Sequence, residues 1–316
     1  MKSPGMTVGL AALTVLLAAP AFSQNEGVQG RGEAVVTVLP KHEGEVPPSV
    51  ANQDLAVKLD GKNARVTQWA PFVSPDNRLE LVLLIDNSAR SSLGGQMDDI
   101  ARFIKSLPPN VTAAIAYMEN GRAAFAAPLS ADHEPVLKAL HVPGGSAHSS
   151  SSAYFCLSDL AQHWPSRDTR ARREVVMVTD GVDAYQPRFD PDDPYVQAAI
   201  TDAVRAHLVV YSIYWMDRGL ADQGSSASNA GQSLLLEVTQ ATGGKSFWEG
   251  MGNPVSFEPY FDELIRRFRN QYELGFSTVL RGKPEVESLK LKLSAPGAEV
   301  DAPRQVMVAP AAPAQR

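Results

Sequence analysis

Two aspartates each come directly after an apolar run, and their carboxylates are of a kind that could hold a hard cation. Asp86 follows the run at residues 81–85, and Asp180 follows Thr179 after the run at 174–178. The carboxyl ends of parallel strands meet at one edge of a sheet, so both carboxylates are expected there. Mg²⁺ takes about six oxygens and accepts one or two carboxylates together with waters. The pattern therefore predicts a charged oxygen site at one sheet edge.

The elements that must position these aspartates are strands buried on both faces. Mostly apolar runs at residues 81–85, 174–178 and 208–213 are typical of a parallel sheet that is covered on both sides. Segments between and after the runs carry apolar residues at helical spacing, and Asn120-Gly121 separates two runs that should pair as a hairpin. This alternation predicts an α/β fold with a mainly parallel sheet, one antiparallel edge strand and helices on both faces.

Strand-like segments also flank this region on either side. Residues 34–39, 55–59 and 64–69 precede it, and 274–277 and 288–293 follow it; most of them alternate apolar with polar side chains. We expect the two ends of the chain to combine into a small flanking β module, with residues 308–316 left as a frayed tail.

Composition excludes several classes of protein. The 316 residues carry 29 basic and 35 acidic side chains, a net charge of −6, and no long basic run, so nucleic acid is a poor partner. The single cysteine, Cys156, excludes an intrachain disulfide framework and a multi-cysteine zinc site, and we expect it to be buried. His148 stands beside several serines, but no Gly-x-Ser-x-Gly element follows a strand, so we expect no hydrolase and no enzyme.

The first residues have the features of a secretory signal peptide. Lys2 precedes an apolar run at residues 6–19, and Ala21 and Ser23 provide small residues at a cleavage position. The run is shorter than the ~20 residues of a membrane span, and Pro20 interrupts it. We expect cleavage near Ser23, a secreted or periplasmic protein, and no transmembrane segment in the mature chain.

The two aspartate motifs resemble those of a von Willebrand factor A-type (VWA) domain. Asp86-x-Ser88 after one strand and Thr179-Asp180-Gly181 after a later one match that family in order and spacing over residues 79–272. The whole chain is similar to bacterial secreted VWFA-related proteins of acidobacterial type, to judge from residues 46–69, 154–155, 192–197, 210–215 and 270–274. The implied division is a signal peptide at 1–23, β segments at 24–78 and 273–307, and a VWA domain at 79–272.

The resemblance implies a metal-ion-dependent adhesion site. In that family the site uses an Asp-x-Ser-x-Ser loop, a threonine from a second loop and an aspartate from a third. Asp86, Ser88 and Asp180 fill three of these places, and Ser151, with Ser152 as the near alternative, stands where the threonine would be. Mg²⁺ or another divalent cation is the implied cofactor.

The third place of the first loop holds Arg90 in place of serine, and this leaves two interpretations. In the first, Arg90 points away, Ser91 or a water supplies the missing oxygen, and the site holds a cation. In the second, the arginine, which stays charged at working pH, pairs with Asp86 or Asp180 and replaces the cation.

The function that the resemblance implies is that of a non-enzymatic binding or adhesion module. It would engage a protein or an extracellular or envelope matrix ligand through the strand-end face, with Arg90 and Asp183 as further partner contacts. The acidic loop after Asp180 has a second interpretation, in which Asp192 or Asp193 only caps the next helix. The alternative function is a structural or assembly scaffold of the cell envelope that acts through the flanking β segments.

Overall fold

The computed structural model describes residues 28–42, 44–73, 77–145, 152–183, 190, 192–216, 225–250, 252–280 and 282–311, without the side chains of residues 90, 91 and 225. The expected signal peptide at 1–23 lies outside these ranges. Within them, none of the helices has both the length and the apolar character that crossing a membrane requires.

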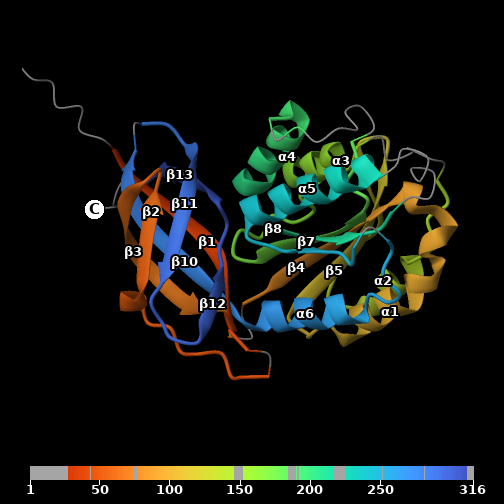
Figure 1. Ribbon diagram of the computed structural model, residues 1–316, viewed down its shortest axis with the longest axis horizontal. Helices are drawn as coiled ribbons and strands as arrows, with labels where there is room; N and C mark the ends of the chain where they lie inside the picture. The colour runs from red at the N-terminus through yellow and green to blue at the C-terminus, as the bar shows by residue number, and fades with distance from the viewer. Residues whose placement is uncertain are drawn as a thin grey trace, which may run out of the picture.

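The larger half of the molecule is built on a six-stranded sheet in the order β6-β5-β4-β7-β8-β9 (Figure 1). Its described strands are β4 (Leu79–Asp86), β5 (Val111–Glu119), β6 (Arg122–Ser130), β7 (Arg172–Thr179), β8 (Leu208–Tyr214) and β9 (Ser246–Phe247). The pairing of β5 with β6 is antiparallel, and the other four pairings are parallel. The sheet therefore mixes both directions, with its antiparallel strand at one edge.

Helices cover both faces of this sheet. One layer holds α3 (Ala153–Gln162), α4 (Pro194–Arg205) and α5 (Ser225–Thr242); the other holds α1 (Met97–Ser106), α2 (His133–Ala139) and α6 (Glu258–Arg269) (Figure 1). Every residue of β4 is buried, and its side chains alternate between the two layers. Leu83 and Ile85 pack with the α1–α2–α6 layer, whereas Val82 and Leu84 pack with the α3–α4–α5 layer. The α/β class predicted from the apolar runs is confirmed.

The helix expected after the first aspartate differs in its start. Residues 87–96 form a 3-10 segment, η2 (Asn87–Gln96), before the α-helix begins at Met97. Asp86 caps this segment by accepting the backbone N–H of Ser88, so the chain turns sharply as soon as β4 ends. Cys156 is fully buried, as its apolar neighbours indicated.

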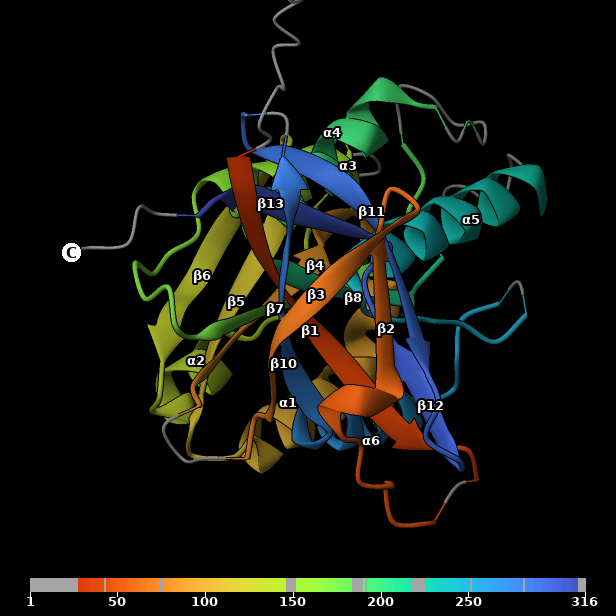
Figure 2. The same cartoon turned by 90° about the vertical axis from the view of Figure 1, so that its left-hand side faces the viewer.

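The flanking strands form a closed antiparallel barrel, seen on the left of Figure 1 and facing the viewer in Figure 2. Its described elements are β1 (Val28–Pro40), η1 (Asn52–Asp54), β2 (Leu55–Leu59), β3 (Lys62–Pro71), β10 (Gln271–Leu280), β11 (Glu285–Leu293), β12 (Ala298–Asp301) and β13 (Gln305–Pro310). The sheet order is β10-β3-β2-β11-β13-β1-β12, and β10 also pairs with β1, which closes the ring.

The two ends of the chain combine into one β module, as expected, but the module is larger than predicted and closes into a barrel. β1 and β10 pair over ten residues, from Val28 opposite Leu280 to Thr37 opposite Gln271, and the barrel has its own apolar core around Phe276. β13 also continues to Pro310, into the segment expected as a tail, because Val308 is buried in that core.

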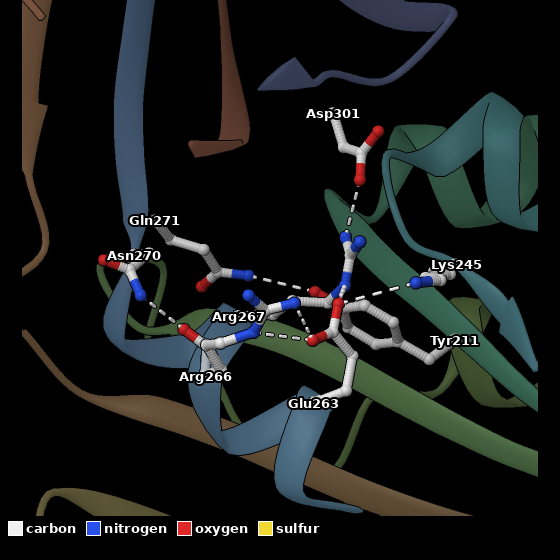
Figure 3. Close-up of polar contacts among 8 residues, drawn as sticks. All are labelled: Tyr211, Lys245, Glu263, Arg266, Arg267, Asn270, Gln271 and Asp301. Carbon is white, nitrogen blue, oxygen red and sulfur yellow. Dashed lines mark hydrogen bonds and ion pairs between the residues drawn. The ribbon is translucent and has the colours of Figure 1, made fainter. Parts of the chain in front are cut away.

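Polar side chains join the barrel to the α/β half beneath α6 (Figure 3). Arg267 of α6 is buried and donates from Nη1 to Oδ2 of Asp301 on β12 at 2.7 Å, and from Nε to Oε1 of Glu263 at 2.9 Å. Gln271, the first residue of β10, donates to the hydroxyl of Tyr211 on β8 at 3.2 Å. The two halves are thus joined by the buried Arg267, which pairs with the partly exposed Asp301, and by the neutral contact of Gln271 with Tyr211.

Candidate functional site

Asp86 lies at the carboxyl end of β4 and accepts three hydrogen bonds from the chain. Its Oδ1 accepts the backbone N–H of Ser88 at 2.9 Å and the hydroxyl of Ser88 at 2.6 Å. Its Oδ2 accepts the hydroxyl of Thr179 at 2.7 Å. Asp86 is only 3% exposed, so these donors replace most of the water that the carboxylate gives up on folding. The structure thus brings together Asp86 and Ser88, two of the predicted site residues.

Thr179 joins the ends of β4 and β7, although it was not among the predicted site residues. Ile85 pairs with Val178, so the next residue of each strand, Asp86 and Thr179, meet at the sheet edge. The Thr179 hydroxyl donates to Asp86 and accepts the backbone N–H of Gly181 at 3.2 Å. Its signal was present in the sequence, because a hydroxyl at the last position of one parallel strand faces the last position of its neighbour.

Asp180 lies in the loop that follows Thr179 and is 6% exposed. Its Oδ1 accepts the backbone N–H of Val182 at 2.9 Å, which fixes the loop after β7. Gly181 adopts a φ of +67°, a conformation that favours glycine. Helix α5 presses on this loop at Gly231, where a Cβ atom would come within 2.0 Å of the Asp180 carbonyl oxygen. The position of Asp180 is therefore set by close packing.

The start of α3 completes this edge. Ser152 caps the helix, and its hydroxyl oxygen accepts the backbone N–H of Tyr154 at 3.3 Å. The hydroxyl of Tyr154 donates to the Gly181 carbonyl at 2.6 Å, so α3 is tied to the loop of Asp180. Burial, and then the charges of Asp180 and Asp183, hold the pKa of Tyr154 well above its ordinary value. Ser151, predicted as the second-loop ligand, lies outside the described residues.

The two predicted partner contacts have different outcomes. Asp183 is 0% exposed, and its charge acts on the buried Tyr154, so it lies on the inner side of the loop. Burial does not favour a role for it as a partner contact. The side chain of Arg90, within η2, is outside the described part of the structure, so its role stays a prediction. Asp193 caps α4 through the N–H groups of Tyr195 and Val196, as the second interpretation of the acidic loop expected.

The oxygen atoms at this edge are of the kinds that bind a small hard cation. Asp86 and Asp180 provide carboxylates, and Ser88 and Thr179 provide hydroxyl oxygens that keep lone pairs free while they donate to Asp86. In the described ranges, however, no group of three or more histidine, cysteine, aspartate or glutamate side chains is placed to bind a metal. The hydrogen bonds to Asp86 also stabilise its charge without a cation.

Comparisons with known proteins give only distant likenesses. No protein-family model matches the sequence, and no curated protein matches it significantly. Solved structures with a similar fold include an aerotolerance-related membrane protein from Bacteroides fragilis NCTC 9343, at 11% identity and a TM-score of 0.41 over 60% of this chain and 98% of that one. The SpRpn10 VWA domain matches at 12% identity and a TM-score of 0.37, over 60% of this chain and 94% of that one.

A third likeness extends to the barrel. The pilus adhesin SpaC from Lactobacillus rhamnosus GG covers 87% of this chain, which spans 49% of the adhesin, at 10% identity and a TM-score of 0.44. At such identities and scores these likenesses carry no conclusion about what this chain does.

Proposed function

We propose that the chain is an exported, non-enzymatic VWA-type binding module that engages a protein ligand at the carboxyl ends of β4 and β7. The observation that supports this most is the cluster of Asp86, Ser88 and Thr179, whose hydroxyl groups converge on one carboxylate at 2.6 and 2.7 Å. Strand-end edges of this kind are where α/β sheets bind ligands. Helix α5 packs closely against the Asp180 loop at this edge.

The proposal includes a divalent cation such as Mg²⁺ at this edge. Asp86, Ser88 and Asp180 would hold it, with Ser151 as the predicted fourth group. A bound cation would offer a coordination position to a carboxylate of the partner. Since Mg²⁺ keeps several waters and needs only one or two protein carboxylates, a site with few acidic groups is compatible with it. Without a cation, Arg90 would meet an acidic group of the partner instead.

Cation binding is tested by melting. Chelator-treated protein is titrated with Mg²⁺ or Mn²⁺ into the millimolar range while its melting temperature is followed, beside an Asp86→Asn and Asp180→Asn double variant. A saturable rise in the wild-type chain that the double variant lacks supports the cation. Equal responses of the two proteins would remove it from the proposal.

Partner binding is tested by capture from a cell-envelope extract, with and without chelator, on three immobilised proteins of verified fold. They are the wild-type chain, the Asp86→Asn and Asp180→Asn double variant, and a barrel control with Lys58→Glu and Lys290→Glu. Lys58 and Lys290 pair across β2 and β11 and are exposed. We expect the strand-end variant alone to lose the partner. Loss from the barrel control alone would favour the envelope scaffold instead.

A further inference from the structure

A cavity of about 530 Å³ lies between the barrel and the α/β half, at the amino ends of β7 and β8. Both halves contribute apolar walls: Val35 and Met307 come from the barrel, and Val204 and Leu208 come from the α/β half. Its volume falls within the range of small-molecule sites, roughly 300 to 1,000 Å³, and such sites occur preferentially between domains. The cavity is at the opposite end of the sheet from Asp86.

Arg172, the first residue of β7, is the buried charge in the cavity wall. It is 6% exposed, and its guanidinium lies 4.7 Å from the centre of the Phe72 ring. Nη1 donates to the Phe268 carbonyl at 3.2 Å and to Oε1 of Gln271. Nε has no hydrogen-bond acceptor among the described residues, although it is shielded from water. A buried donor left unsatisfied in this way is costly and calls for a partner.

Glu174, the nearest acidic group, neutralises the charge of Arg172 only in part. Oε1 of Glu174 is 3.7 Å from Nη1, beyond hydrogen-bond distance, and neither carboxyl oxygen of this fully buried residue has a hydrogen-bond partner in the described structure. Burial, opposed by Arg172, raises the pKa of Glu174 to about 7. Burial therefore favours the uncharged form of Glu174, beside a guanidinium that stays positive.

The other charged groups at the cavity either form an ion pair with another residue or are partly or fully exposed to solvent. Arg173 forms an ion pair with Glu80 at 3.9 Å. Glu33, Arg170 and His207 are exposed, and Glu273 is half-buried; within the described chain none of them forms an ion pair with Arg172. The apolar part of the cavity is thus next to Arg172, the most deeply buried of its charged groups, whose charge is incompletely neutralised.

We propose that this cavity binds a small amphiphilic carboxylate, an apolar molecule with one anionic end. Its carboxylate would face the guanidinium of Arg172 and form a charge-assisted hydrogen bond with it. Its apolar body would fill the space between the barrel and the α/β half. Because both halves line the cavity, such a ligand would also hold them together.

The probes for this site are decanoate and decan-1-ol, which differ in charge but share an alkyl chain. Binding of each to the full chain is measured by isothermal titration calorimetry near pH 7.5. We expect decanoate to bind saturably with one site, and decan-1-ol to bind at least about tenfold more weakly, since a charge-assisted hydrogen bond is lost. Equal affinity for the two probes, or no saturable decanoate binding into the millimolar range, would overturn the proposal.

Two variants and one control locate the binding. Arg172→Met should reduce decanoate binding about tenfold or more and abolish the preference over decan-1-ol, whereas Arg122→Met, at an exposed position on β6, should leave both unchanged. If Arg172→Met fails to fold, Ala206→Phe serves in its place, because Ala206 lines the cavity at the end of α4 and a phenyl ring would fill it. Undiminished decanoate binding by Ala206→Phe would overturn the assignment.

Discussion

The two ends of strand β7 hold buried charges under opposite conditions. At its carboxyl end, Thr179 donates to Asp86, whose carboxylate accepts hydrogen bonds at 2.9, 2.6 and 2.7 Å. At its amino end, Arg172 and Glu174 face each other at 3.7 Å, and the carboxyl oxygens of Glu174 accept no hydrogen bond from the described residues. The two ends are about 23 Å apart at roughly 3.3 Å per residue.

The two ends differ in how far the hydrogen bonds of the chain satisfy a buried charge, and this difference determines what each end can still bind. Hydroxyl and amide donors from the same domain satisfy the carboxylate at one end, so that end is rigid and needs nothing further to fold. At the other end the barrel covers a charged pair without supplying enough donors. An incompletely satisfied buried charge is costly by several kcal/mol per ion in general, and a bound molecule can recover part of that cost.

The difference between the two ends is tested most directly by replacing Arg172. Arg172→Met leaves Glu174 buried without its ion-pair partner, so we expect the free energy of unfolding to fall by about 3 kcal/mol or more at pH 8. The loss should be smaller at pH 5, where Glu174 is protonated. Urea denaturation at both pH values measures it, with Arg122→Met as the control expected to stay within about 0.5 kcal/mol of wild type. Equal losses of stability in the two variants would mean that Arg172 does not stabilise the buried Glu174.

Glu174 should make the stability of the amino end depend on pH. Its pKa in the folded chain, about 7, is above the ordinary value of 4.5, so the folded state holds the proton more tightly than the unfolded state. The contribution of Glu174 to stability is therefore complete below pH 4.5 and is lost as the pH rises through 7, by at most about 3 kcal/mol.

Glu174→Gln removes this titration. We expect the stability of the variant relative to wild type to rise from pH 5 to about pH 7 and to level off by pH 8, as measured by urea denaturation at unit intervals. Stability curves that run parallel for the two proteins would show that Glu174 titrates normally and that its burial has no effect at this end.

At the carboxyl end, the expected effects are smaller. Asp86→Ala removes the acceptor of three hydrogen bonds and leaves the buried hydroxyls of Ser88 and Thr179 without it. We expect a loss of about 2 kcal/mol in the free energy of unfolding. Asp86→Asn, which keeps one acceptor oxygen, should lose less. A loss below about 0.5 kcal/mol for Asp86→Ala would show that the cluster adds little to stability.

The smallest effect is expected at Tyr154. Tyr154→Phe removes the hydrogen bond of 2.6 Å to the Gly181 carbonyl and keeps the packing of the ring, so we expect a loss of about 1 kcal/mol. Tyr195→Phe is the matched control, because Tyr195 is 47% exposed. Thermal melts of the two variants compare them, and indistinguishable melting temperatures would argue against a stabilising link between α3 and the Asp180 loop.

The carboxyl end could be predicted from the sequence because its information is local. Apolar runs identified β4, β7 and β8, and the rule that parallel strands share an edge placed Asp86 beside the Thr179-Asp180 turn. The role of Thr179 was missed, since the acceptor that its hydroxyl faces, Asp86, can be identified only once the register of the two strands is known.

The amino end and the barrel could not be predicted because they depend on distant pairings. Glu174 begins an apolar run, a position typical of an exposed strand start, and only the barrel closing over it makes it buried. That closure joins Val28 to Leu280, and no local pattern signals a pairing across so much chain. The sequence alone therefore does not show whether a polar residue at the start of a strand is buried when a second domain covers that strand.

The barrel that both ends of the chain build also constrains the order in which the protein is made. β3 ends at Pro71 and its partner β10 begins at Gln271, with the entire α/β half between them. At 5–20 residues per second, a ribosome takes on the order of 10 to 40 s to cover that interval. During this time the three N-terminal strands have unpaired edges. The α/β half can form first, and the barrel closes last, beside a domain that has already folded.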